Sequence, residues 1–188
     1  MGLTRHIVSG PTGPLVRVWA AECDSPTDFS SIASVNPGIG FARIGGRTSV
    51  HLRGPATRAS TLSCPKDTEY FGVDFRLGAY LPMFPPATLA NLQDAVLPSL
   101  SDGRILLDGE AWEMPTPMNV DVFVDRLARA GLLVVDPLID DLRHGDARAL
   151  PERTAQSRFV QAVGLSRRAR ARRSPTWSST PGTTTSRT

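Results

Sequence analysis

Apolar and polar residues alternate in short runs between residues 15 and 107, which predicts β-strands separated by turns. The clearest run is 70–77, where every second side chain is apolar and Asp74 falls on the other face. In 48–53 the apolar side chains also share one face, and the opposite face is polar. Short strands with one polar face, at this spacing, predict an antiparallel sandwich or barrel.

The apolar spacing changes to that of amphipathic helices after the break Pro115-Thr116-Pro117. One helix is predicted over 120–130, with Gly131 as its C-cap. A second begins at Pro137 behind an Asp136 N-cap and stops near Gly145. A third spans Glu152–Val163 and is closed by Gly164. Three short helices, the last one basic, are typical of a helix-turn-helix unit.

These elements predict an α+β protein in three parts. Residues 1–112 form a β-rich sensor or dimerisation domain, and 113–166 form a short helical bundle containing one helix-turn-helix. Residues 167–188 have no apolar periodicity and are expected to be a disordered basic tail.

Charge is distributed unevenly along the chain. From Arg148 onward there are nine arginines and one acid, Glu152, a charge of +8, which leaves −5 for residues 1–147 because the whole chain carries +3. This asymmetry is expected either of a sensor joined to a DNA-binding part or of a merely soluble basic tail. We expect no membrane partner and a cytoplasmic location, since no apolar run is long enough for a span or a signal peptide.

The residues that carry most enzyme chemistry do not occur in recognisable patterns. His6, His51 and His144 are isolated, and no GxSxG motif or glycine-rich phosphate loop is present. Cys23 and Cys64 belong to no CxxC motif, so we expect two reduced, half-buried thiols. The sequence therefore predicts no enzyme, no cofactor and no metal site.

The run Glu-Arg-Thr-Ala-Gln-Ser-Arg-Phe-Val-Gln-Ala-Val-Gly-Leu-Ser at 152–166 resembles the first recognition helix of AraC-family transcription regulators, roughly Ser-x-Arg-Thr-Leu-Gln-Arg-Arg-Phe followed by Gly-Leu-Ser. The segments 70–78, 81–82, 107–115 and 120–127 are similar to one N-terminal arm of that family. The resemblance covers about residues 15–166. It implies sequence-specific DNA binding under the control of a β-rich sensor.

The resemblance implies that the third helix enters a major groove. The side chains off its apolar stripe would then contact DNA: Arg153, Thr154, Gln156, Ser157, Arg158 and Gln161. The alternative is a solvated polar helix face. A runner-up function is a truncated ligand-binding or dimerisation module without specific DNA binding.

The sequence departs from the family pattern at several positions. Pro151 replaces a capping Ser, Ala155 replaces a larger aliphatic residue, and Ser157 replaces an Arg. The second helix-turn-helix unit of the family has no counterpart, which suggests that residues from Arg167 on are an out-of-frame or otherwise non-native ending. Reading the gene in its other frames tests this hypothesis.

A small-molecule effector and a second copy of the chain are the other expected partners. Six aromatic side chains either line an effector pocket or, as is commoner, form core: Trp19, Phe29, Phe41, Phe71, Phe75 and Trp112. The helix Val120–Ala130 either supplies a dimer face or, again more commonly, packs in the core.

Overall fold

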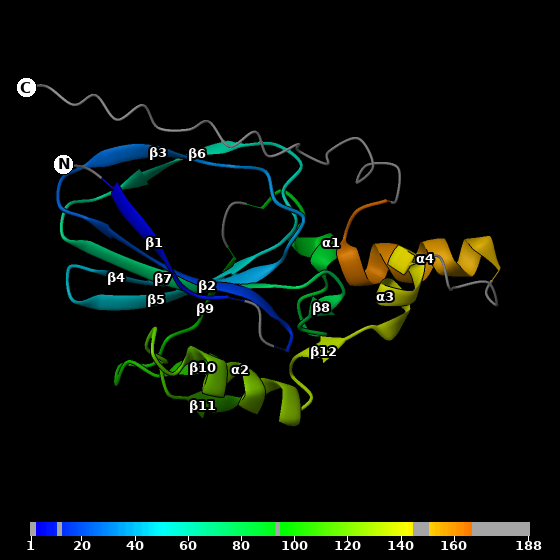
Figure 1. The fold of residues 1–188 in the computed structure, drawn as a ribbon. Coiled ribbons are helices and arrows are strands. Elements are labelled where there is room, and N and C mark those ends of the chain that lie inside the picture. Colours follow the sequence, from blue (N-terminus) through cyan, green and yellow to red (C-terminus); the bar gives the residue numbers. More distant parts are fainter. Residues whose placement is uncertain (1–2, 11–12, 93–94, 145–150, 167–188) are drawn as a thin grey trace, which may run out of the picture.

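The computed structural model describes residues 3–10, 13–92, 95–144 and 151–166 (Figure 1). The predicted tail from Arg167 lies outside these residues, as do the arginines within it. The elements in chain order are β1 (Leu3–Ser9), β2 (Leu15–Cys23), β3 (Thr27–Ser31), β4 (Gly38–Ile44), β5 (Arg47–Arg53), β6 (Ser60–Cys64), β7 (Thr68–Phe75), β8 (Ala79–Tyr80), α1 (Pro86–Leu89), β9 (Ala95–Leu97), β10 (Ile105–Leu107), β11 (Glu110–Trp112), α2 (Val120–Arg129), β12 (Val134–Val135), α3 (Pro137–His144) and α4 (Glu152–Val163).

The main sheet has six antiparallel strands in the order β1-β2-β7-β4-β5-β9. It is open, with β1 and β9 at its edges. Strands β3 and β6 do not belong to this sheet. They pair with each other as a separate antiparallel ribbon, called the β3–β6 ribbon below. In Figure 1 the ribbon lies over one face of the sheet, and α2 with β10 and β11 lies against the other. The prediction of a β-rich antiparallel N-terminal region is confirmed, whereas closure into a barrel is not seen.

The main core fills the space between the sheet and α2. Alternate side chains of the central strands point to this face, among them Val18, Ile39, Val50, Leu52 and Val73. Helix α2 adds its buried apolar stripe of Val120, Phe123, Val124 and Leu127. The apolar face of this helix therefore packs in the core, the commoner of the two roles expected for it.

A second, smaller core cluster holds α3 and α4 at one end of the sheet. It joins the buried side chains Leu77, Ile139, Phe159, Ala162, Val163 and Leu165. The helix Glu152–Val163 has the predicted bounds, and Pro151 before it provides no side-chain cap. Gly164 ends it at φ +77°, where a Cβ would lie 2.6 Å from the Pro86 carbonyl carbon of α1. Only glycine satisfies both constraints, and α4 can therefore approach α1 closely.

The expectation for the two cysteines was wrong. Cys23 and Cys64 form a disulfide, and both are buried rather than half-buried. The pairing could not be foreseen because 41 positions separate them, and they meet only when β6 of the ribbon lies beside the end of β2. The bridge therefore ties the ribbon to the main sheet.

None of the helices in the described ranges has the length and apolarity needed to cross a membrane.

Reduction of this disulfide should destabilise the protein. A bridge typically contributes about 2–4 kcal/mol, chiefly by restricting the unfolded chain. We expect urea unfolding monitored by circular dichroism to show a lower midpoint with dithiothreitol than without it. Identical midpoints, with thiol titration confirming reduction, would contradict the bridge.

Candidate functional site

A cavity of about 360 Å³ lies between the β3–β6 ribbon and the main sheet. Its wall on the sheet side comes from β1, β2, β4, β5 and β7, and its opposite wall comes from the ribbon and the loop that follows β3. The polar side chains that line it include Arg5, Arg17, Ser30, Ser31, Ser34, His51, Arg53 and Tyr70. The polar sheet face predicted from strand alternation thus forms the wall of a cavity.

Two neighbouring rows of residues across the sheet make up the floor, and Arg17, Trp19, Gly40, His51 and Arg53 are the members that line the cavity. One row runs Arg17–Asp74–Gly38–Arg53 and the next runs Trp19–Gly72–Gly40–His51, read from β2 through β7 and β4 to β5. In each row glycine occupies the β4 position. Because glycine has no side chain, the larger residues on either side can extend over the middle of the sheet.

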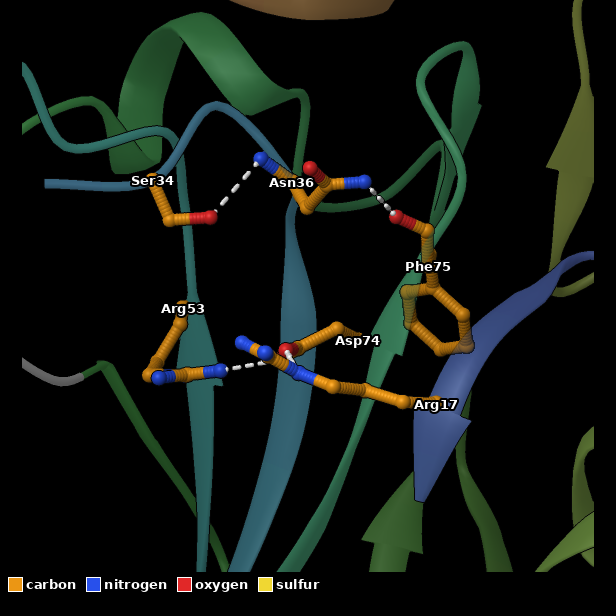
Figure 2. Close-up of polar contacts among 6 residues, drawn as sticks. All are labelled: Arg17, Ser34, Asn36, Arg53, Asp74 and Phe75. Carbon is orange, nitrogen blue, oxygen red and sulfur yellow. Dashed lines mark hydrogen bonds and ion pairs between the residues drawn. The ribbon is translucent and has the colours of Figure 1, made fainter. Parts of the chain in front are cut away.

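Asp74 is the charged centre of the first row, and its side chain is only 2% exposed. Arg17 Nε donates to one of its carboxylate oxygens and Arg53 Nη2 donates to the other. Figure 2 shows the Arg17 and Arg53 side chains extending from opposite sides to the Asp74 carboxylate. A buried carboxylate needs such partners, since an unpaired charge in the interior is costly. The same contacts hold both arginines over the cavity floor.

Trp19 occupies the second row and is flanked by cations. The Arg5 guanidinium carbon lies 5.0 Å from the indole centroid, and that of Arg53 lies 5.4 Å from it. Both are cation–π distances. The indole lies over Gly72, where a Cβ would be 2.6 Å from a ring carbon of Trp19. Gly72 therefore makes the room that the indole occupies.

The cavity carries an excess of positive charge. Three arginines line it, and Asp74 supplies one negative charge against them. No acidic side chain appears in the cavity lining among the described residues. Partial burial lowers the pKa of the Arg5 guanidinium, and Arg17 and Arg53 lower it further, against the opposite effect of Asp74. Arg5 stays protonated near neutral pH, and its lowered pKa reflects burial first and repulsion by the neighbouring arginines second.

Asn36 anchors the loop between β3 and β4. Its side-chain Nδ2 donates to the Phe75 carbonyl at 2.7 Å, and its backbone N–H donates to Ser34 Oγ at 3.2 Å (Figure 2). Ser34 lines the cavity, and its neighbour Val35 packs against the cluster beneath α4. Two consecutive residues of this loop, Ser34 and Val35, therefore contact the cavity and the core cluster beneath α4, respectively.

The sequence analysis left open whether six aromatic residues line a pocket or form core, and the structure divides them between these two roles. Trp19 and Phe29 line the cavity, and Phe41 contributes to its wall while its ring packs in the main core. The Phe41 ring stacks on Phe71 with centroids 4.6 Å apart. Phe75 and Trp112 are buried in the main core.

Of the six residues predicted to contact DNA, five lie on the outer face of α4 and Gln156 lies at its edge. Five are exposed: Arg153, Thr154, Ser157, Arg158 and Gln161. Gln156 is half-buried. Arg158 Nη2 lies 3.3 Å from both carboxylate oxygens of Asp136, the residue whose Oδ1 accepts from the Leu138 N–H at the start of α3. One of the six is therefore engaged within the chain.

Sequence reasoning missed the arginine cluster. Asp74 and Arg53 were assigned to a polar face, and Arg17 was not singled out. A charged residue in an apolar run, as in Val-Asp-Phe at 73–75, was the available signal.

Comparisons of the chain with models of known families, with curated proteins and with solved structures find no match.

The floor geometry predicts different tolerance at two neighbouring glycines. A Cβ at residue 72 would clash with Trp19 and with the Ile39 carbonyl oxygen at 2.7 Å, whereas at residue 40 its nearest contact is the His51 carbonyl oxygen at 3.9 Å. We expect Gly72→Ala to lower the free energy of unfolding by about 1–3 kcal/mol, as overpacking does. Gly40→Ala is the matched control and should change it by less than about 1 kcal/mol. Equal effects in urea unfolding would show that the indole does not occupy this position.

Proposed function

We propose that the chain is a cytoplasmic DNA-binding transcription regulator of the AraC type, with α4 as the helix that reads the promoter. The observation that carries the proposal is the two-sided character of α4. Its apolar side is buried on Leu77 and Ile139, while Arg153, Thr154 and Gln161 are exposed on the outside. Arginine and glutamine offer the paired donors and acceptors that base edges require.

The cavity is the proposed effector site. The loop after β3 connects it physically to α4, because Ser34 lines the cavity and Val35 packs with the α4 cluster. A ligand that prefers one position of this loop would bias the position of α4, which is the requirement for control by an effector. A homodimer completes the proposal, since one small helical unit buries little surface on DNA.

A second candidate is a ligand-binding or dimerisation module without specific DNA binding. Two observations favour it. Helix α2 packs in the main core rather than with α3 and α4, and Arg158 is paired with Asp136 instead of being available to a base. In this case the cavity, and not α4, is the functional part of the chain.

Binding to DNA of the chain's own promoter region and to scrambled DNA separates the two candidates. We expect at least about tenfold preference for the promoter by fluorescence anisotropy, retained at the higher of two salt concentrations, because base contacts depend less on salt than phosphate contacts do. Equal weak binding that disappears with salt would favour the second candidate.

A matched pair of arginine variants locates the reading surface. Arg153→Ala should weaken promoter binding by about fivefold or more, the loss expected of a base contact. Arg129→Ala removes an arginine of α2 that is also exposed, and it should leave promoter binding unchanged. Equal losses from both variants would indicate that only net charge matters, and α4 would not be the reading helix.

A further inference from the structure

The cavity is specialised in a way that an effector site in general does not require. It combines cations on the sheet side with apolar side chains on the ribbon side, where Phe29, Ile32 and Leu62 face it. Its volume of about 360 Å³ lies at the small end of the range of about 300–1,000 Å³ that is common for ligand pockets. A compact ligand with two chemically different ends fits such a space.

We propose that the cavity binds a small aromatic carboxylate, with its carboxylate against Arg5, Arg17 and Arg53 and its ring between Trp19 and the ribbon. The proposal rests on the proposed function in one respect, namely that the cavity takes an effector at all. The chemical class of the ligand is the new inference.

The charge of the cavity argues for an anion. One carboxylate, Asp74, faces three guanidinium groups, so a second negative charge would relieve the remaining repulsion. Arg17 and Arg53 each use one nitrogen for Asp74, and a guanidinium has five N–H donors. Within the described residues, Arg53 Nε and Trp19 Nε1 are buried without a hydrogen-bond acceptor. Donors are therefore in excess around this floor.

The apolar walls argue for a flat ring rather than a bare inorganic ion. Phe29 and Leu62 belong to paired positions of β3 and β6, so their side chains are neighbours on the ribbon. They line the cavity from the ribbon, and Trp19 lines it from the sheet. Ile32, which also lines the cavity, is 67% exposed although it is apolar. A ring placed here would cover apolar surface that now meets water.

Benzoate and benzamide are the probes, because they share one ring and differ in charge. Titration of the uniformly ¹⁵N-labelled full-length chain would follow the indole N–H resonance of Trp19, assigned with Trp19→Phe. We expect benzoate to shift this resonance with about tenfold higher affinity than benzamide, since hydrogen bonds to a charged group are stronger. Inorganic phosphate, which has no ring, should bind at least about tenfold more weakly than benzoate.

Arg5→Gln and Arg129→Gln are the matched variants. The Arg5 guanidinium lies over the Trp19 indole, whereas the hydrogen bonds to Asp74 come from Arg17 and Arg53, so this change leaves the Arg17–Asp74–Arg53 contacts in place. It should weaken benzoate binding by about fivefold while leaving benzamide binding unchanged. Arg129→Gln removes the same charge far from the cavity and should change neither.

Four results would overturn the proposal. The first is equal binding of benzoate and benzamide, and the second is no shift of the Trp19 resonance by either probe up to about 10 mM, a range that covers weak ligands of this size. The third is phosphate binding as tight as that of benzoate, and the fourth is an equal loss of benzoate binding in the two arginine variants. These titrations contain no DNA. Promoter binding without benzoate binding would therefore reject the ligand class and leave the regulator intact, whereas the reverse result would reject the regulator and leave the cavity site.

Discussion

The pairing of Asp74 with Arg17 and Arg53 is the interaction on which the cavity depends. It joins three strands, β2, β7 and β5, on the face of the sheet that does not carry the main core. Arg53 reaches Asp74 across Gly38, where a Cβ would lie 3.3 Å from the carboxylate oxygen and 2.4 Å from the Val73 carbonyl oxygen. A side chain at this position would interrupt the row. The same contacts fix the two guanidinium groups above the floor, so one buried carboxylate sets both the local charge and the shape of the cavity.

The two faces of the sheet thus have different tasks. One face buries aliphatic and aromatic side chains under α2 and accounts for most of the described core. The other face holds polar and glycine-rich rows, covered by the ribbon and tied to it by the Cys23–Cys64 disulfide. That disulfide is unusual for the proposed cytoplasmic location, where thiols are normally kept reduced. The ribbon is also paired along its length and hydrogen-bonded from Ser63 Oγ to Asp28 Oδ1 at 2.5 Å, so we expect its two strands to stay paired when the thiols are reduced.

Local patterns predicted the elements, and long-range pairing determined the site. The runs 48–53 and 70–77 lie within β5 and largely within β7, and α4 has its predicted bounds, because period-2 and period-3.6 patterns and the Gly164 cap are local signals. The alternation also placed Asp74 off the core face. It could not reveal that Arg17 and Arg53 lie beside Asp74, since strand order and register join residues 57 and 21 positions away from it. The disulfide was missed for the same reason. The domain boundaries and the helix-turn-helix stay predictions.

A double-mutant cycle with Arg53→Gln and Asp74→Asn tests the central claim most directly. Each variant and the pair would be unfolded in urea, and the coupling energy taken from the four free energies of unfolding. If the buried carboxylate organises the arginines, the coupling should be favourable by at least about 1 kcal/mol, as for residues in one ion-pair network. Additive effects, within about 0.3–0.5 kcal/mol, would mean that Arg53 and Asp74 act independently, and the cavity would not depend on their contact.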